Sequence, residues 1–242
     1  MKVFAEIISK MLNQSLRNGI FPDELKIAIT RPIFKKGDPY DPKNYRPISI
    51  LPIIEKVFET YVVRHLRKYL EDNLIINSKQ YGFQRGKNTE QLLNTVNDYI
   101  NTNMDKGRYT IAVFIDFVKA FDTIDHALLL KKLEACGIIG KELKWIKSYL
   151  ENRCHIVKVC NEHSEPKPCD FGVPQGRILG PIFFLIYVND LPKVIEKCVL
   201  YMFADDAVLL YAHSNIQVCQ AVIQSEFNNV IEWTHGTQRL LQ

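Results

Sequence analysis

Two adjacent carboxylates, Asp205 and Asp206, interrupt one of the most apolar stretches of the chain, YMFADDAVLL at residues 201–210. Burying an ionised carboxylate is costly unless a partner compensates its charge. No Lys or Arg lies between Lys197 and Arg239 to provide that charge from a nearby position in the sequence. If these carboxylates are buried, another positive charge must therefore balance them.

A third carboxylate occupies a similar setting, because the apolar segment YTIAVFI at residues 109–115 leads directly into Asp116. Two strands that each end in Asp can lie side by side, so we expect Asp116 close to Asp205. Like charges about 4 Å apart repel by roughly 4 kcal/mol at a protein surface. Mg²⁺ relieves such repulsion, and paired Mg²⁺ ions serve phosphoryl transfer. The alternative is a solvated turn, where Asp is common.

Hydrophobic periodicity indicates the elements that would position these carboxylates. Apolar strands at 199–203 and 207–211 predict a tight hairpin with Asp205 and Asp206 at its tip. Further strands are predicted at 109–115 and 155–160, and helices at 53–70, 89–103, 128–136 and 141–150. Five prolines within residues 31–52 predict mostly loop and short strand there. Helices interspersed with hairpins favour an α+β fold.

Composition indicates an ordinary folded protein, with 47% hydrophobic and 24% charged residues. The longest uncharged apolar run, residues 178–189, is too short to cross a bilayer, and the N-terminus is not a signal peptide. We therefore expect a soluble intracellular protein. Residues 1–90 hold 16 Lys and Arg against 10 Asp and Glu, and residues 91–242 hold 15 against 17. This asymmetry would suit a polyanion held against a metal-binding face, although a solvated surface is the alternative.

The six cysteines show no C-x-x-C pair. Cys154, Cys160, His163 and Cys169 can be drawn as a zinc site, but their spacings match no common ligand pattern. Reduced thiols are the preferred interpretation.

Five segments together resemble one protein family. DFVKAFD (116–122), GVPQGRILGP (172–181) and FADD (203–206) resemble the three palm motifs of reverse transcriptases of non-LTR (LINE-like, jockey-type) retrotransposons. The segments at 32–51 and 80–91 resemble the fingers of the same enzymes, and the similarity runs from about residue 19 to residue 233. The resemblance implies a right-hand polymerase with a basic fingers-like region at 1–108, which begins with an N-terminal helix. It also implies a palm at 109–242, whose antiparallel sheet is backed by helices.

The resemblance implies a catalytic role for the carboxylates. Asp116 and Asp205 would bind two Mg²⁺ ions, for which Mn²⁺ can substitute, and Asp206 would assist. The main-chain carbonyl of Phe117 would complete the metal shell. Phe121 would lie under the incoming sugar and exclude a 2′-hydroxyl; core packing is the alternative for this side chain.

The resemblance also implies contacts with nucleotide and nucleic acid. Lys35 and Arg46 would hold the incoming triphosphate, although the sequence cannot firmly rank Lys35 above Lys36. Gln175 would contact the nucleotide, with Gly172 and Gly176 along the template and the nascent base pair. Arg85 and Lys87 would contact template phosphates. A solvated surface position is the alternative for each basic residue.

Several positions depart from the family pattern. Arg177 stands where the family usually has Ser, so this cation would clash beside the template–primer track or bind a phosphate. Val118 replaces a small polar residue and Gln84 replaces an Arg. The family usually continues beyond Trp233, so we expect a C-terminally truncated reverse transcriptase domain that lacks a thumb.

The expected activity is RNA-directed DNA polymerisation from dNTP onto a primer 3′-hydroxyl, with an RNA template and a DNA primer as partners. We expect a nuclear or cytoplasmic location and no membrane, and leave the oligomeric state open. One alternative is a weak or inactive retrotransposon remnant that only binds nucleic acid. Another, an RNA-dependent RNA polymerase, is disfavoured by Phe121 and by the fingers segments.

Overall fold

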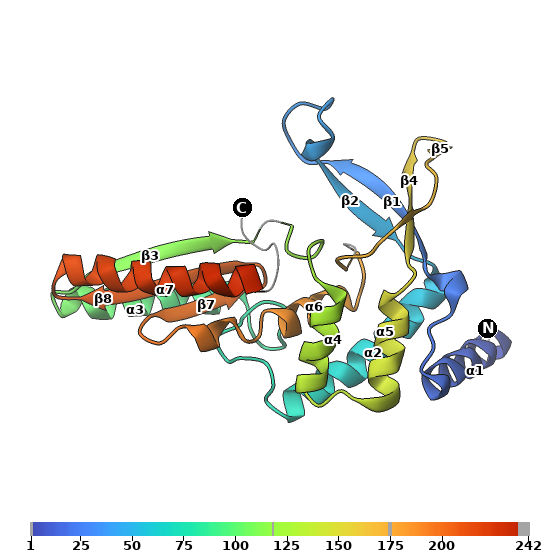
Figure 1. Ribbon diagram of the computed structural model, residues 1–242, viewed down its shortest axis with the longest axis horizontal. Coiled ribbons are helices and arrows are strands. Elements are labelled where there is room, and N and C mark those ends of the chain that lie inside the picture. The colour runs from blue at the N-terminus through green and yellow to red at the C-terminus, as the bar shows by residue number, and fades with distance from the viewer. Residues whose placement is uncertain (1, 118, 174–175, 237–242) are drawn as a thin grey trace. The chain divides into compact units, whose positions relative to one another are not determined.

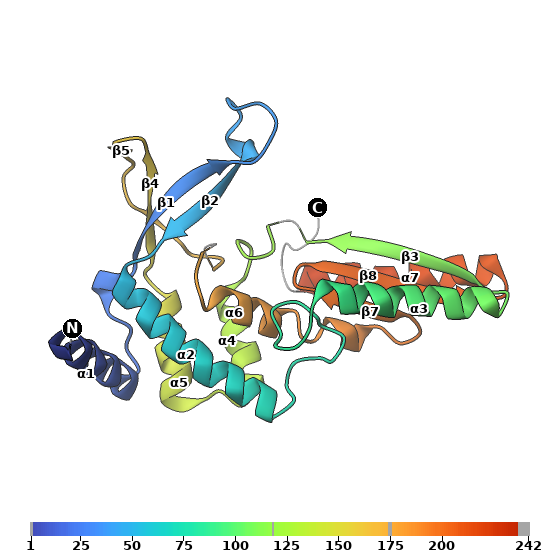
Figure 2. The ribbon, with the colours of Figure 1, turned by 180° about the vertical axis from the view of Figure 1, so that it is seen from behind.

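The structure, a computed structural model, describes residues 2–117, 119–173 and 176–236. The chain forms two compact units, and each combines segments that are distant in sequence. Unit 1 comprises residues 1–69 and 121–183, and unit 2 comprises residues 70–120 and 184–242. Figures 1 and 2 show the elements from opposite sides. The expected division at residue 108 into fingers and palm remains a prediction.

Unit 1 contains a mixed sheet in which strand order and sequence order differ. Its strands are β1 (Ile27–Phe34), β2 (Tyr45–Ile50), β4 (Cys154–Val159), β5 (Glu162–His163) and β6 (Lys167–Pro168). The order is β2-β1-β4-β5, and β6 pairs with β4. β1 runs antiparallel to β2 and parallel to β4, so this sheet joins a hairpin to a distant segment.

The hairpin of β1 and β2 begins earlier than the sequence indicates. The prolines at 31–52 predict mostly loop and short strand, which agrees with strand at 31–34 and 45–50, but β1 already starts at Ile27 and has eight residues. Pro32 lies opposite Pro47 in the register. Because proline lacks a backbone N–H, this arrangement places both missing donors at one position of the ladder, and the remaining pairs can form.

Helices pack together in unit 1 around aromatic side chains. The helices are α1 (Lys2–Asn18), α2 (Ile53–Asp72), α4 (His126–Ala135) and α5 (Gly140–Leu150), with short 3₁₀ turns at Asp23–Leu25 and Pro42–Asn44. Phe21 is fully buried and makes edge contacts with Phe58, Trp145 and Tyr149 at centroid distances of 6.3, 5.4 and 5.1 Å. These aromatic contacts tie α2 and α5 to the segment that follows α1.

Unit 2 contains a three-stranded antiparallel sheet in the order β3-β8-β7, with β3 (Tyr109–Asp116), β7 (Val199–Phe203) and β8 (Asp206–His213). α7 (Ile216–Gly236) contacts β8 and β3, while α3 (Thr89–Asp105) contacts β3 and β7. A 3₁₀ turn at Leu191–Val194 also packs on α7. Residues 207–210 of the central strand are all buried. Helices therefore cover the sheet, and its central strand lacks the alternation of buried and exposed residues that a sheet with one solvated face would show.

The predicted mixture of helices and sheets is confirmed, and the four predicted helices and four predicted strands are present within a few residues of their expected bounds. α6 (Gly180–Tyr187) and α7 were not predicted. α6 falls in the uncharged run GPIFFLIY, which has no polar face and hence no helical periodicity to recognise. No helix in the described part of the chain is long and apolar enough to cross a membrane.

Candidate active site

The carboxylates predicted to act together lie at one end of the unit 2 sheet. Asp116 is the last residue of β3, Asp206 is the first residue of β8, and the two are directly paired in the antiparallel register. Residues opposed in this way point to the same face, with Cβ atoms about 4.5–5.5 Å apart. Both side chains are exposed. The end of the sheet therefore presents two carboxylates side by side.

The register corrects one prediction about the hairpin. Phe203 pairs with Asp206, so the turn contains only Ala204 and Asp205. We expected both aspartates at the tip, but Asp206 is already the first residue of β8 and is the cross-strand partner of Asp116. Asp205 is still near Asp116, whose charge acts on it. The hydrophobic pattern places a hairpin without fixing its register to one residue.

Asp205 lies in the turn and is half-buried. Burial raises the pKa of this carboxyl group, and the like charges of Asp206 and Asp116 raise it further, while a backbone hydrogen bond acts in the opposite direction. The backbone N–H of Phe117 points to the carbonyl oxygen of Asp205 at 3.5 Å. The three carboxylates thus form one interacting cluster of negative charge.

The chemistry of this cluster suits Mg²⁺, which prefers carboxylate oxygens. Over the described residues, however, no three His, Cys, Asp or Glu side chains converge closely enough to hold a metal ion. The donor types therefore fit Mg²⁺, and the ligand set, including the carbonyl of Phe117, remains a prediction. The same finding gives no support to the alternative zinc site, and all six cysteines are free thiols.

A segment that sequence reasoning assigned only by resemblance pairs with the hairpin. The N–H of Tyr81 donates to the carbonyl of Met202 at 2.7 Å, and the N–H of Met202 donates to the carbonyl of Lys79 at 3.0 Å. Gly82 lies so close that a Cβ atom there would be 2.1 Å from the nitrogen of Ala204. Residues 79–82 therefore pack directly on the turn that contains Asp205. No charge or metal-ligand pattern in the sequence marks this role.

The two predicted template cations differ in their surroundings. Arg85 is exposed, whereas Lys87 is half-buried. The ammonium of Lys87 donates to the carbonyl of Ser78 and, at 2.7 Å, to that of Gln80, and it lies 4.8 Å from the ring centre of Tyr81. Burial lowers the pKa of Lys87. This cation stabilises its own loop, and template binding by either residue remains a prediction.

Unit 1 contains the predicted glycine loop, in which glycine is needed at two positions. Gly172 has φ +77° and Gly176 has φ +99°, in the region that favours glycine. A Cβ atom on Gly172 would lie 2.6 Å from the carbonyl oxygen of Asp122, and one on Gly176 would lie 2.8 Å from that of Ser49. The loop therefore runs against two other segments of unit 1. The predicted Gln175, like Val118, lies outside the described residues.

Backbone hydrogen bonds fix the start of this loop. The N–H of Gly172 donates to Ile124 and the N–H of Val173 donates to Phe121, each at 2.8 Å. His126 adds a third contact, since its Nε2 lies 2.8 Å from the carbonyl oxygen of Gly172 and must donate to it. Phe121 is half-buried, which leaves both its predicted sugar contact and ordinary packing open.

Arg177, at the end of the glycine loop, is not available to nucleic acid. Its side chain is 1% exposed and its Nη1 lies 2.8 Å from a carboxylate oxygen of Glu55, which is 0% exposed. The interpretations of a steric clash with the template or a phosphate contact are therefore wrong. A buried carboxylate 122 residues away in the sequence accounts for this cation.

Glu55 and Arg177 belong to a larger buried network. Arg153, 3% exposed, also bonds Glu55, and its guanidinium lies 4.6 Å from the ring centre of Tyr149. Burial raises the pKa of Glu55, against the lowering effect of the two Arg charges. Over the described residues, Glu55 Oε2, Arg153 Nε and Arg177 Nε are buried without a hydrogen-bond partner.

Glu59, one helical turn after Glu55 on α2, extends the network to the backbone. Its Oε1 accepts from the hydroxyl of Tyr149 at 2.5 Å, and its Oε2 accepts from the N–H of Ile178 at 2.6 Å and of Leu179 at 3.4 Å. These N–H groups precede α6, where a carboxylate is favourable. Two carboxylates of α2 therefore anchor the end of the glycine loop to the helix. We call Glu55, Glu59, Arg153 and Arg177 the ionic anchor.

The predicted nucleotide cations lie on the β1–β2 hairpin. Lys35 and Arg46 are both exposed. The N–H of Lys35 donates to the carbonyl of Asn44 at 2.8 Å, which continues the ladder by one position. Strand alternation then places Lys35 and Arg46 on the same face as diagonal neighbours. The hairpin can therefore present two positive charges to an anion.

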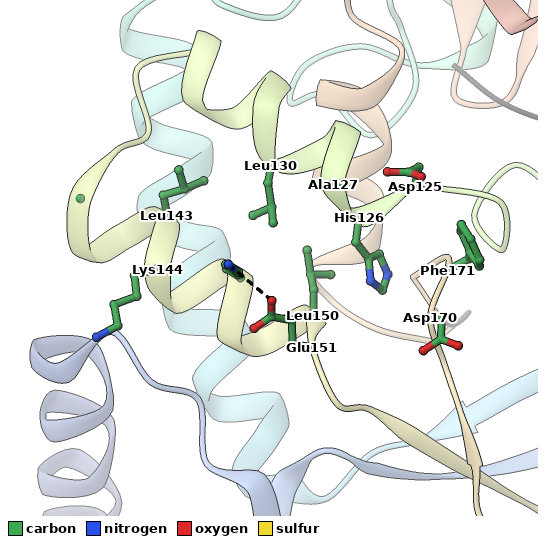
Figure 3. A pocket seen from close by; sticks show the side chains of 12 residues that line it. Asp125, His126, Ala127, Leu130, Leu143, Lys144, Leu150, Glu151, Asp170 and Phe171 are labelled. Atoms are coloured by element: carbon green, nitrogen blue, oxygen red, sulfur yellow. Dashed lines mark ion pairs between the residues drawn. The ribbon is translucent and has the colours of Figure 1, made fainter. Parts of the chain in front are cut away.

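Several cavities lie in unit 1, and two of them are near the glycine loop or along α4 and α5. Gly172 lines a small one of about 220 Å³ together with Thr30, Ser49, Asp122 and His155. A cleft of about 770 Å³ lies along α4 and α5, where Leu130, Leu143 and Leu150 face His126, Asp170 and Phe171 (Figure 3). The ion pair drawn at its edge joins Lys147 and Glu151 at 3.7 Å. All lining residues belong to unit 1, whereas the three carboxylates belong to unit 2.

Comparison with known proteins places this arrangement in a family. The family described as "Reverse transcriptase (RNA-dependent DNA polymerase)" matches residues 33–236. The probable RNA-directed DNA polymerase from transposon BS of Drosophila melanogaster is 32% identical over 237 residues, 93% of this chain and 26% of that protein. The RNA-directed DNA polymerase from mobile element jockey of the same species is 30% identical over 240 residues, 96% of this chain and 26% of that protein.

Solved telomerase structures are similar in fold. Apo telomerase from Candida tropicalis, truncated from its C-terminal domain, has a TM-score of 0.58 and 13% identity, over 94% of this chain and 51% of that chain. Telomerase from Candida albicans, in complex with a telomeric RNA fragment, has a TM-score of 0.57 and 13% identity, over 96% and 44%. The chain spans about a quarter of the length of the curated relatives it matches. It belongs to the reverse transcriptase family, and its relatives there are the RNA-directed DNA polymerases of jockey-type and other non-LTR retrotransposons.

Proposed function

We propose that this chain catalyses RNA-directed DNA synthesis, in which a primer 3′-hydroxyl attacks the α-phosphate of a dNTP and pyrophosphate leaves. The observation that carries the proposal is the register pair of Asp116 and Asp206, with Asp205 in the adjoining turn. A cluster of three carboxylates that make no ion pair within the described residues is well suited to divalent ions. The names of the curated relatives support the same reaction class.

Asp116 and Asp205 would hold two Mg²⁺ ions, with Asp206 and the Phe117 carbonyl assisting. When bound, these ions would activate the attacking oxygen and stabilise the charge on the leaving oxygen. Nucleotide recognition is assigned to unit 1. Lys35 and Arg46 would neutralise the triphosphate, because fixed cations near developing phosphate charge stabilise the transition state.

Template and sugar selection are assigned to further residues of both units. Gly172 and Gly176, with Gln175 between them, would allow close approach of the template, since glycine adds no side chain. Phe121 would exclude ribonucleotides. Exposed Arg85 suits a phosphate contact that is sensitive to salt but not to sequence.

Primer extension on poly(rA)/oligo(dT) tests the proposal. With Mg²⁺ present, Asp205→Asn should lower incorporation by roughly 10²–10³-fold, the effect of removing one electrostatic stabiliser of a transition state. Asp98→Asn is the matched control, because Asp98 is an exposed residue of α3 in the same unit.

Equal background incorporation by the wild-type chain and Asp205→Asn would contradict the enzymatic function of this chain. Filter binding of the same template then decides the alternative. Retained, salt-sensitive binding without incorporation would identify a protein that only binds nucleic acid.

A further inference from the structure

The side chain of Gln80 contacts the turn that contains Asp205. Its Oε1 accepts from the backbone N–H of Ala204 at 2.9 Å and from that of Gly82 at 2.8 Å. Its Nε2 lies 3.5 Å from the carbonyl oxygen of Ala204. The Gln80 residue is 1% exposed. One buried neutral amide therefore reaches both polar backbone groups of the residue that precedes Asp205.

Ala204 needs such support because its backbone is unfavourable. It has φ +56°, in the left-handed region that L-residues other than Asn and Asp rarely adopt, and it is 5% exposed. A conformation of this kind persists only when the surrounding structure imposes it. The contacts from Gln80 and the close packing of Gly82 supply that constraint.

The position of Gln80 is itself fixed. The hydrogen bonds of Tyr81 and Lys79 to Met202 attach the residues on either side of Gln80 to β7. The carbonyl of Gln80 accepts from Gln84 Nε2 at 2.6 Å and from Lys87 Nζ at 2.7 Å. Both the backbone and the side chain of Gln80 are therefore held in place.

We propose that Gln80 is the positioning residue for Asp205: its amide holds Ala204 in the left-handed conformation that directs the Asp205 carboxylate toward Asp116 and Asp206. The inference deepens the proposed function and rests on it for the catalytic consequence. A neutral amide suits this place, because a cation would compete with a metal ion for the carboxylates. An apolar side chain would leave buried N–H and C=O groups of Ala204 without partners, which is costly.

Gln80→Met tests the proposal, since Met has a similar length but cannot make these hydrogen bonds. Hydrogen exchange followed by mass spectrometry should show roughly tenfold faster exchange in residues 202–208, the effect of losing one or two hydrogen bonds. Exchange in α7 should stay unchanged. Gln224→Met, an exposed residue of α7 in the same unit, is the control.

The catalytic readout is a split of kinetic constants. Gln80→Met should lower kcat roughly 10–100-fold, as misplacement of a reacting group does, with KM for dNTP within about twofold of the wild type. If Gln80→Met loses thermal stability while hydrogen exchange at 202–208 stays unchanged, the role of Gln80 is merely structural and the proposal is overturned.

Exchange also separates this inference from the proposed function, because it needs no activity. An inactive wild-type chain would refute the function, while faster exchange at 202–208 in Gln80→Met would still support the role of Gln80. If Gln80→Met does not fold, Gly82→Ala reaches the same turn through its overlap with Ala204. Its control is Gly236→Ala, where a Cβ atom meets nothing within 4 Å. Equal exchange at 202–208 in both glycine variants would overturn the proposal.

Discussion

The glycine loop of unit 1 and the Asp205 turn of unit 2 are stabilised in opposite ways. The loop ends in the ionic anchor, where two buried carboxylates of α2 bond two buried guanidinium groups and two backbone N–H groups. The turn is held by one uncharged amide. Both arrangements join segments far apart in sequence, but only one of them introduces charge.

The two kinds of anchor differ because the turn carries carboxylates whose charge an ion pair would neutralise, whereas the glycine loop does not. In the described part of the chain, Asp116, Asp205 and Asp206 make no ion pair, so their negative charge remains free to attract a cation. A buried Arg beside the turn would neutralise that charge. The glycine loop has no such restriction, and its ionic anchor has two acidic and two basic groups that balance. The charged ionic anchor therefore suits the glycine loop. The uncharged amide of Gln80, which we call the neutral anchor, suits the turn that contains Asp205.

The largest expected effect is that of Arg177→Ser, which introduces the residue usual in the family. Removing Arg177 leaves the two buried carboxylates of the ionic anchor with Arg153 as its one remaining cation, so we expect the free energy of unfolding to fall by about 3–5 kcal/mol. Chemical denaturation measures it. Lys147→Ser is the control, because the exposed pair Lys147–Glu151 should contribute at most about 1 kcal/mol. If both variants lost equally little free energy of unfolding, the ionic anchor would stabilise the chain no more than an exposed ion pair does.

A double-mutant cycle measures how strongly Glu55 and Arg177 depend on each other. Replacing Glu55 and Arg177 together by Met leaves Glu59 and Arg153, which still balance in charge. We expect the double variant to be more stable than the sum of the two single losses predicts, by about 0.5–3 kcal/mol. Strict additivity of the three free energies of unfolding would mean that the two side chains act independently.

The smallest expected effect concerns Lys87, a charged group beside the neutral anchor. Burial lowers the pKa of Lys87 below its ordinary value of 10.5. The folded chain therefore binds this proton less strongly than the unfolded chain. The stability of the wild type relative to Lys87→Met should then rise as the pH rises from the lowered pKa toward 10.5.

Thermal unfolding of the wild type, Lys87→Met and the exposed-site control Lys106→Met, measured between pH 7 and about 10.5, checks the sign. A difference that falls with pH would show that the hydrogen bonds to Ser78 and Gln80 stabilise the charged form more than burial destabilises it.

The sequence predicts the strands of the candidate site better than the side-chain contacts that stabilise them. The strands next to Asp116, Asp205 and Asp206 stand out because apolar runs adjoin these carboxylates. The predicted turn is too long by one residue, because the length of a tight turn depends on backbone geometry that the hydrophobic pattern does not encode. β1 was underestimated because Pro32 reads as a breaker until Pro47 is known to lie opposite.

The two anchors could not be predicted, for related reasons. Arg177 lies next to a recognised motif, and its partner Glu55 lies 122 residues away on a helix whose periodicity gives no sign of a buried charge. Gln80 is neutral, and its contact with Ala204 spans 124 residues. Long-range polar pairs follow from the packed fold and leave no local pattern.

Mn²⁺ binding, measured by the loss of the free-ion electron paramagnetic resonance signal, tests whether the end of the β3–β8 pair binds a metal ion. The wild-type chain and Asp98→Asn should bind Mn²⁺ equally, and Asp116→Asn combined with Asp205→Asn should lose that binding. Equal binding by all three proteins would contradict the claim that the end of the β3–β8 pair is a metal site held ready by a neutral anchor.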